Sequence, residues 1–244
     1  MVVMPAYNAE KTVVKTYDEV VSQEIVDAVV IVDDASDDKT VEVIKKLKHD
    51  KVKTVINIHE NNLGYGGNQK TCYRLALHEG GDIIIMVHPD YQYTPMLIPA
   101  MAGMIVNHLY DCVMASRVIG GGALKGGMPF WKYIANRSLT FVGNFLLGAS
   151  LSEYHTGYRA FSRDLLKALP LERNSNGFIF DNEIIAQILW KNATIGEISC
   201  PTKYFPEASV INFRYSVIYG FGCLRVAIAY RLAKLGVIKS QLFT

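Results

Sequence analysis

The sequence predicts an α/β fold in which helices cover both faces of a mostly parallel sheet. Short runs rich in valine and isoleucine alternate with longer segments of helical periodicity along the first part of the chain. These runs lack a polar alternation, as is typical of strands that are buried on both faces of a parallel sheet. Half of the 244 residues are hydrophobic and 20% are charged, which suits a globular chain with a sizeable core.

The first part of the chain is expected to contain four strands connected by helices. Each apolar run is followed by a segment of helical character, and a strand–helix–strand connection within one sheet makes its two strands parallel. Loops that contain proline, aspartate or glycine separate the two kinds of segment. The expected strands are 1–4, 26–32, 52–58 and 82–87, and the expected helices are 10–23, 39–48 and 69–78.

The second part of the chain alternates less regularly. Its glycine-rich stretch 120–127 is expected to be a flexible loop over the site. The other expected elements are helix 94–108, strand 112–116, helix 131–147, a strand and turn over 154–163, helix 184–191, strand 195–201 and a helical tail over 215–235. We therefore expect one domain over residues 1–214 and an appended helical segment over 215–244.

Polar residues gather directly after three of the expected strands. Ligands of open α/β sheets bind outside the carboxyl ends of the strands, so a nucleotide or a metal ion is expected at this edge. Two simpler interpretations stay open, because the aspartates can cap the following helix and the later polar residues can form an ordinary turn. The polar residues are Asp33 and Asp34, the glycine-rich loop 61–68, and the trio His88, Asp90 and Gln92.

Charge and cysteine content argue against several classes of protein. The net charge of +2 gives no case for nucleic-acid binding. The four cysteines are scattered, without the paired spacing of a zinc site or a disulfide framework, which fits a reducing cytoplasm. We expect no signal peptide, and no run of about 18 uncharged apolar residues supports a membrane-spanning helix.

The tail 215–235 is long, apolar and basic. From residue 203 onward, six lysine and arginine residues stand against one glutamate, a local excess of 6 − 1 = +5. A helix of this kind can lie in a membrane interface with its basic residues among lipid phosphates. The alternative is a helix that packs on the domain or on a second subunit, and we favour the membrane interpretation.

Seven short motifs occur in an order known from one enzyme family. The motifs are PAYNAE at 5–10, VVIVDDAS at 29–36, NLGYGGN at 62–68, DYQ at 90–92, ASR at 115–117, GYRAF at 157–161 and GFIFDNE at 177–183. Over about residues 1–215 the chain resembles the family-two glycosyltransferases of the GT-A fold, a nucleotide-diphospho-sugar transferase fold. It most closely resembles their polyprenyl- or dolichyl-phosphate hexosyltransferase branch. Each motif alone is weak, whereas the ordered set is specific.

The resemblance implies a donor site. A divalent cation, Mg²⁺ or Mn²⁺, would lie on the donor diphosphate, held by Asp90 and Gln92 with His88 as a third candidate ligand. The family usually has an Asp-x-Asp pair here, and His88 replaces its first aspartate, which makes Mn²⁺ a contender. Alternatively, His88 hydrogen-bonds the ribose or a phosphate. The implied nucleotide-sugar contacts are Pro5, Tyr7, Glu10, Asp33, Asp34, Asn68 and His88.

The resemblance also implies an acceptor site. Arg117, Arg137 and Arg214 would approach an acceptor phosphate, and Asp181 or Glu183 would face the acceptor. A phosphate acceptor is already ionised near neutral pH and needs arginines that orient it. A sugar hydroxyl would instead need a general base such as Asp181 or Glu183. The expected catalytic residues are Asp90, Arg117, Asp181 and Glu183.

We therefore expect an inverting glycosyltransferase that moves a hexose from a GDP- or UDP-linked donor to a polyprenyl phosphate. Inversion follows from the resemblance alone. Residues 1–214 would form the catalytic domain, and 215–244 would contact the cytoplasmic membrane face peripherally or form a homo-oligomer. Two alternatives stay open: a family-two enzyme that glycosylates a saccharide hydroxyl in glycoconjugate assembly, and a sugar-nucleotide-binding protein without catalysis.

Overall fold

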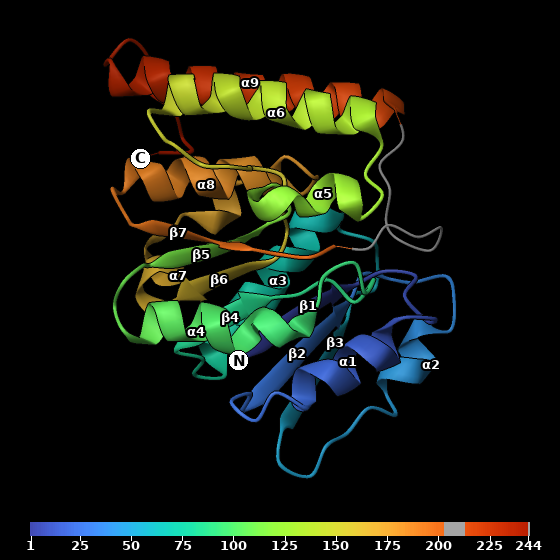
Figure 1. Cartoon of the computed structure of the whole chain (residues 1–244). Helices are drawn as coiled ribbons and strands as arrows, with labels where there is room; N and C mark the ends of the chain where they lie inside the picture. The colour runs from blue at the N-terminus through green and yellow to red at the C-terminus, as the bar shows by residue number, and fades with distance from the viewer. Residues whose placement is uncertain (203–212, 244) are drawn as a thin grey trace.

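A seven-stranded sheet forms the centre of the molecule (Figure 1). The computed structural model describes residues 1–202 and 213–243, with the side chains of 213–215 outside the description. The strands are β1 (Val2–Ala6), β2 (Ala28–Asp33), β3 (Lys53–Ile58), β4 (Ile83–Met86), β5 (Cys112–Ser116), β6 (Arg159–Ser162) and β7 (Ile195–Ser199). Their order across the sheet is β3-β2-β1-β4-β6-β5-β7.

The sheet is mostly parallel, as predicted. The pairs β1–β2, β1–β4, β2–β3 and β5–β7 are parallel, whereas β6 runs antiparallel to both β4 and β5. The regular alternation of strand and helix along the first four strands produces the larger parallel part. Only the later strands, where the sequence alternates less regularly, introduce an antiparallel neighbour.

Helices cover both faces of the sheet, which confirms the predicted fold class (Figure 1). They are α1 (Val13–Val21), α2 (Thr40–Ile44), α3 (Tyr65–His78), α4 (Ile98–Val106), α5 (Gly122–Lys125), α6 (Phe130–Leu147), α7 (Arg163–Ala168), α8 (Phe180–Trp190) and α9 (Phe213–Lys234). One buried cluster joins the strands to α1, α2 and α4, and the other joins them to α3, α7 and α8. Alternate residues of β1 enter opposite clusters, Val2 and Met4 one and Val3 the other, so the strand is apolar throughout.

The long helices α6 and α9 lie side by side as an outer layer beyond α8 (Figure 1). Helix α9 packs against both α6 and α8. Its buried residues Cys223, Val226, Ala227 and Tyr230 share one face of the helix. The apolar tail is therefore attached to the domain along its length.

Several local elements differ from the prediction: the helix expected over 184–191 begins at Phe180, and the helix expected over 39–48 ends at Ile44. The helix expected from residue 69 begins at Tyr65, because the N–H of Gly66 finds a tertiary acceptor, the carbonyl of Asn176, at 2.7 Å. The stretch expected to be a flexible loop contains the short helix α5. The turn expected after β6 is the helix α7, whose N-terminus is capped by Ser162 accepting a hydrogen bond from Leu165 N.

Candidate active site

Strained backbone marks the loops that follow β1, β2 and β4. Asn8, Ala35 and Tyr91 have φ angles of 50°, 57° and 58°, a left-handed conformation that residues other than glycine rarely adopt. Because the three strands are neighbours in the sheet, these residues lie along one carboxyl-terminal edge. Strain of this kind persists only where the surroundings impose it, and it clusters at binding sites. Three of the five described non-glycine residues with positive φ thus lie on the edge that was predicted to bind a nucleotide.

The loop after β1 is tied to the loop after β2. Glu10 Oε2 accepts a hydrogen bond from Lys39 N at 3.0 Å, and the Tyr7 hydroxyl donates to Asp37 Oδ2 at 3.4 Å. Tyr7 is 49% exposed, whereas Pro5 is buried within β1. Two of the predicted nucleotide contacts, Tyr7 and Glu10, therefore lie on the rim between the loops, and Pro5 lies beneath them.

Asp34 organises the glycine-rich loop. Its buried carboxylate accepts hydrogen bonds from the backbone N–H groups of Leu63 and Gly64, at 2.8 and 2.9 Å. A third contact, of 2.8 Å, joins it to Nδ1 of His59. These bonds hold the start of α3 against the end of β2.

Asp33 and Asn68 are also bound to the protein itself. The Asn68 amide donates to the carbonyls of Ala6 and Val32 at 3.2 and 3.1 Å, so it links β1 to β2. Asp33 accepts hydrogen bonds from the backbone N–H and the hydroxyl of Ser36 at 3.0 and 2.5 Å. If these side chains contact a ligand, they do so with polar atoms that already form hydrogen bonds within the protein.

The loop after β4 presents Asp90. Its Oδ1 accepts a hydrogen bond from the N–H of Gln92 at 3.1 Å, and the side chain is partly exposed, whereas Gln92 is buried. Among residues 1–202 and 213–243, no group of three or more His, Cys, Asp or Glu side chains could hold a metal ion. A hard cation at Asp90 would therefore need oxygen ligands from the donor diphosphate and water, which is how Mg²⁺ is commonly held. The accessible carboxylate of Asp90 fits that coordination.

His88 is held by Tyr65. Its Nε2 lies 3.1 Å from the Tyr65 hydroxyl, and the two rings stack with their centroids 5.4 Å apart. A Cβ atom at Gly157 would collide with Nε2 of His88, so the motif glycine permits this approach. Because Nε2 is engaged, Nδ1 is the nitrogen of His88 that remains for a ligand.

Asp181 is paired on both of its carboxylate oxygens. The Tyr65 hydroxyl donates to Oδ2 at 2.7 Å. Gln69 Nε2 donates to Oδ1 at 3.4 Å, and the buried guanidinium of Arg159 lies 3.4 Å from the same oxygen. Burial, and then the charge of Asp181, raises the pKa of Tyr65 well above its usual value, so this hydroxyl remains a donor.

Glu183 holds the loop that precedes α8. Its buried carboxylate accepts a hydrogen bond from Ser175 N at 2.7 Å. The same loop contacts the start of α3 through the bond from Gly66 to Asn176. Each of the two acidic residues that were predicted to face the acceptor thus already accepts hydrogen bonds from the protein.

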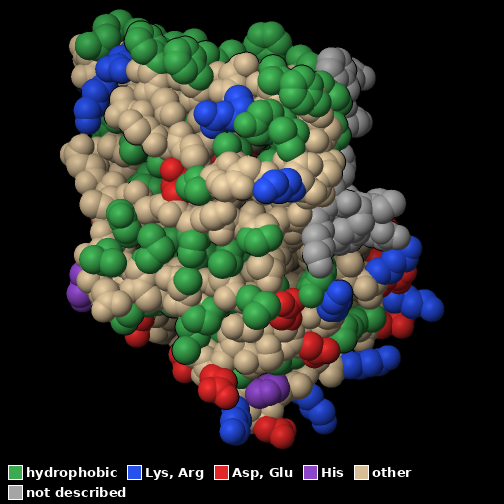
Figure 2. Space-filling view, viewed as in Figure 1, with side chains coloured by type: hydrophobic (Ala, Val, Ile, Leu, Met, Phe, Trp, Pro, Cys, Tyr) green, Lys and Arg blue, Asp and Glu red, His purple; other side chains and the backbone are tan. Residues whose placement is uncertain are grey.

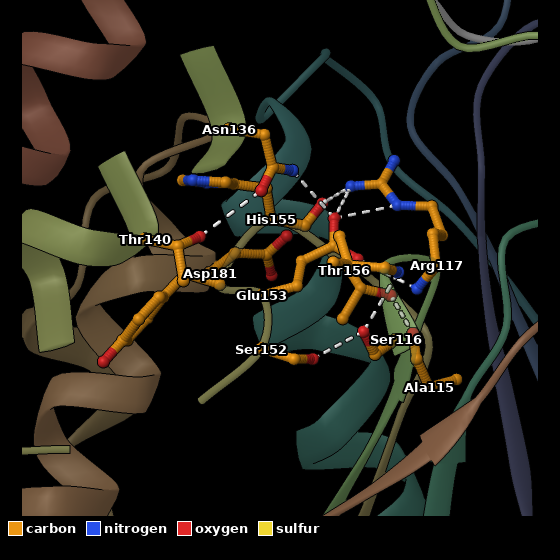
Figure 3. Close-up of polar contacts among 12 residues, drawn as sticks. Ala115, Ser116, Arg117, Asn136, Thr140, Ser152, Glu153, His155, Thr156 and Asp181 are labelled. Carbon is orange, nitrogen blue, oxygen red and sulfur yellow. Dashed lines mark hydrogen bonds and ion pairs between the residues drawn. The ribbon is translucent and has the colours of Figure 1, made fainter. Parts of the chain in front are cut away.

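Arg117 forms a buried ion pair with Glu153 (Figure 3). Glu153 is 0% exposed and accepts hydrogen bonds from Arg117 N at 3.0 Å, Arg117 Nε at 2.9 Å and Asn136 Nδ2 at 3.0 Å. Burial opposes ionisation, but the charge and the hydrogen bonds of Arg117 hold the pKa of Glu153 below its usual range. The pair therefore couples the end of β5 to α6.

Arg117 and Arg137 meet the same short segment, residues 152–155. Arg117 Nη2 donates to the carbonyl of His155 at 2.8 Å, and the exposed Arg137 donates from Nη1 to the carbonyl of Ser152 at 2.7 Å. Two of the three arginines predicted to approach the acceptor phosphate are thus brought together. Arg214 belongs to α9 by its backbone, and its side chain lies outside the described residues.

Three residues that the sequence analysis did not single out organise this region. Glu153 is the first acidic residue after Asp111. Its isolation in the sequence could have marked it as a candidate partner for a nearby arginine. Arg159 is the one charged residue of strand β6, and a buried charge requires a partner. Tyr65 gives no such signal, because its partners are distant in the chain.

The chain matches glycosyl transferase family 2 over residues 1–169. It is 28% identical over 214 residues to a UDP-N-acetylglucosamine–dolichyl-phosphate N-acetylglucosaminyltransferase of Methanococcus voltae, covering 83% of this chain and 84% of that one. It is 30% identical over 203 residues to an uncharacterised protein, MJ1222, of Methanocaldococcus jannaschii, covering 83% and 81%. It is also 30% identical over 221 residues to the low-salt glycan biosynthesis hexosyltransferase Agl6 of Haloferax volcanii, covering 86% and 50%.

Solved structures share the fold at lower identity. Glucosyl-3-phosphoglycerate synthase of Mycobacterium tuberculosis in complex with UDP superimposes with a TM-score of 0.67 at 19% identity, covering 98% of this chain and 80% of that one. TarS residues 1–349 of S. aureus in complex with UDP superimpose with a TM-score of 0.61 at 20% identity, covering 95% and 64%. The molecule has the GT-A fold, and the chain belongs to glycosyl transferase family 2 and is a glycosyltransferase.

Proposed function

We propose that the enzyme transfers a hexose from a nucleotide sugar to a polyprenyl phosphate. The observation that supports this choice is the pairing of Asp181, whose carboxylate is bound by Tyr65, Gln69 and Arg159. Glu183 likewise accepts a bond from Ser175. A sugar hydroxyl would need one of these carboxylates as a free base, whereas an ionised phosphate needs none. The name of the Methanococcus voltae relative, which specifies dolichyl phosphate, supports the same acceptor class.

The donor, a GDP- or UDP-linked hexose, would bind at the edge formed by β1, β2 and β4. Tyr7 and Glu10 would contact the nucleotide from the rim, on the loop after β1, which their own hydrogen bonds tie to the loop after β2. Asp90 would hold a divalent cation, Mg²⁺ or Mn²⁺, with Gln92 and His88 as further candidate ligands. When bound, the cation would neutralise the negative charge that develops on the leaving diphosphate. A solved complex of glucosyl-3-phosphoglycerate synthase contains Mn²⁺ together with UDP-glucose.

In the proposed reaction an oxygen of the acceptor phosphate attacks the anomeric carbon. The bond from that carbon to the nucleoside diphosphate breaks at the same time, and the configuration inverts. When the phosphate is fully ionised, no proton has to be removed. Arg117 and Arg137, with Arg214 at the start of α9, would orient the acceptor phosphate, and Glu153 would keep Arg117 in place.

A polyprenyl acceptor places the reaction at a membrane surface. Its hydrocarbon chain stays in the bilayer and its phosphate lies at the interface. We therefore propose that the enzyme works as a peripheral protein at the cytoplasmic membrane face. The alternative role of the tail is contact with a second copy of the chain.

A transfer assay with UDP- and GDP-hexoses, polyprenyl phosphate and either Mg²⁺ or Mn²⁺ tests the proposal. We expect a lipid-linked hexose with at least one donor, and its absence with every donor would contradict the proposal.

The variant Asp181→Asn separates the two acceptor classes in the same assay. With a phosphate acceptor, the rate should still fall on acidification near a pH of about 6, where the phosphate itself takes up a proton. If Asp181 were the base for a hydroxyl, the variant would lose about 10²- to 10⁴-fold in rate.

A further inference from the structure

Two segments of the chain lack acidic residues, and they include the two helices of the outer layer. Residues 112–152 contain four lysine and arginine residues and no aspartate or glutamate, and residues 208–244 contain five and none. All 23 acidic residues are elsewhere in the chain. The segments include α6 and α9. A net charge of +2 for the whole chain thus conceals a strongly basic region.

The same two helices expose large apolar side chains. Phe141 and Phe145 of α6 are 76% and 74% exposed, and Phe221 of α9 is 71% exposed. Figure 2 shows hydrophobic side chains gathered along the upper edge of the molecule, where α6 and α9 lie. The exposed residues of α6 recur at helical spacing and form an apolar stripe directed away from the domain. Those of α9 form a shorter stripe, about one turn long. The α6–α9 face is defined by Phe130, Ile134, Phe141, Phe145, Ile218 and Phe221.

The opposite side of α9 is fixed to the protein. Tyr230 is 5% exposed and packs edge-on against Trp190 of α8, and Arg231 donates a hydrogen bond to the carbonyl of Phe145 at 2.8 Å. The segment Ser216–Lys234 is long and apolar enough to cross a membrane by length and composition alone, with a mean hydropathy of 1.2. Spanning a bilayer would detach the helix from α6 and α8. Its packing therefore favours a helix that lies flat.

We propose that the α6–α9 face rests on an anionic lipid bilayer, with both helices parallel to the membrane plane. This deepens the proposed function, because a polyprenyl phosphate would be taken from that bilayer. Apolar side chains would enter the boundary between head groups and acyl chains, and the basic residues of the same two helices would meet lipid phosphates. From the sequence, a membrane contact was expected for the tail alone, whereas α6 is an equal part of this surface.

The positive charge of the α6–α9 face favours an anionic lipid surface over a second copy of the chain as its partner. In a two-fold dimer the same patch of both copies would be opposed, so the basic residues Arg137 and Arg225 would approach basic residues of the other copy. No acidic side chain of α6 or α9 is present to compensate. An anionic bilayer complements both the charge and the apolar stripes. A large exposed apolar patch of this kind is unusual on a protein without a partner.

The α6–α9 face also lies next to the arginines that were predicted to approach the acceptor phosphate. Asn136 points inward from α6 and donates to Glu153, which holds Arg117 (Figure 3). The next residue, Arg137, is exposed and bonds to Ser152. A bilayer on the α6–α9 face would therefore present the phosphate of its lipids close to these two arginines.

Flotation of the full-length protein with lipid vesicles tests the surface. We expect binding to vesicles of phosphatidylglycerol and phosphatidylcholine, and about tenfold weaker binding without the anionic lipid. The double variant Phe141→Ser/Phe145→Ser should bind the anionic vesicles more weakly than the unchanged protein, by at least about tenfold. The matched control is Val106→Ser/Leu109→Ser at the end of α4, where the side chains are 61% and 60% exposed, and it should bind like the unchanged protein.

Three results would overturn the proposal. They are no flotation of the unchanged protein, equal flotation of the Phe141/Phe145 variant, and a dimer in light scattering that this variant abolishes. The last result would assign the face to a second copy. Circular dichroism of both variants verifies that their folding is intact.

The outcome is distinguishable from failure of the proposed function. Transfer to a short-chain polyprenyl phosphate in detergent micelles should be unchanged by Phe141→Ser/Phe145→Ser, whereas transfer in vesicles should fall. If no donor gives product in micelles while vesicle binding persists, the proposed function fails and the surface stands. If micelle activity is present and vesicle binding is absent, the surface is wrong and the function stands.

Discussion

The donor half and the acceptor half of the molecule are held together by different interactions. At the donor edge, polar side chains such as Glu10 and Asp34 bond to the backbone of the neighbouring loop. In the acceptor half, buried charges pair inside the protein, Arg117 with Glu153 and Arg159 with Asp181. Removing one member of a buried pair leaves an uncompensated charge, which costs far more than losing a loop contact. Substitutions in the buried pairs of the acceptor half should therefore reduce stability, and substitution of the partly exposed Asp90 at the donor edge should reduce ligand binding.

Glu153→Ala should have the largest effect, because it leaves the guanidinium of Arg117 buried without its partner. We expect the free energy of unfolding to fall by about 3–5 kcal/mol, with loss of transfer activity. Urea unfolding measures the change. The exposed Glu24→Ala is the control and should alter stability by less than about 0.5 kcal/mol. If Glu153→Ala is as stable as the unchanged protein, the buried pair does not distinguish the acceptor half from the donor half.

Asp90→Ala should show the opposite pattern. Its carboxylate is partly exposed and accepts one described hydrogen bond, so stability should change by no more than about 1 kcal/mol. Donor affinity in the presence of Mn²⁺ should fall about 100-fold, because the cation loses its protein carboxylate. Calorimetric titration with UDP- and GDP-sugars, with the exposed Asp50→Ala as control, measures this change. Equal affinities of Asp90→Ala and the control would exclude Asp90 as the cation ligand.

The acceptor half should also impose a pH dependence on stability. Burial, with a smaller contribution from Arg117, lowers the pKa of His155 to about 4. The unfolded chain binds a proton at this residue below a pH of about 6.5, whereas the folded chain does not. Stability should therefore decline as the pH falls from about 6.5 to about 4, by about 2–3 kcal/mol. His155→Gln should flatten this part of the curve in urea unfolding, and identical slopes would contradict the assignment.

Tyr65→Phe should give the smallest of these effects. The variant removes the hydroxyl between His88 and Asp181 but keeps the ring, so we expect a loss of about 1–2 kcal/mol in stability and a modest loss in rate. Tyr110→Phe is the control, because no described hydrogen bond involves its hydroxyl. If both variants behave alike, the link between the two halves through Tyr65 has no energetic weight.

The same contrast explains which parts of the structure could be predicted from the sequence. The strands β1 to β4 and the polar residues that follow them are encoded by local patterns, so the parallel part of the sheet and the donor edge could be predicted from the sequence. The start of α3 was placed too late, because the contact of Gly66 with Asn176 outweighs the low helix propensity of glycine. Propensity does not include such contacts.

The acceptor half could not be predicted in the same way. Arg117 and Glu153 are 36 residues apart, and Tyr65 and Asp181 are 116 apart, so no local pattern pairs them. The motif around Asp181 marked that residue as important without revealing that its oxygens are already bound. The stripe on α6 follows a helical period, but only the fold shows that this side of the helix stays uncovered.

Competition between a polyprenyl phosphate and the corresponding polyprenol for hexose transfer tests the central claim most directly. The two acceptors differ only in the phosphate, and both oxygens of the Asp181 carboxylate are already engaged by the protein, which disfavours Asp181 as the base for a hydroxyl. The account predicts product from the phosphate and none from the alcohol, with at least one nucleotide sugar. Product from the polyprenol, or no product from the phosphate with any donor, would contradict it.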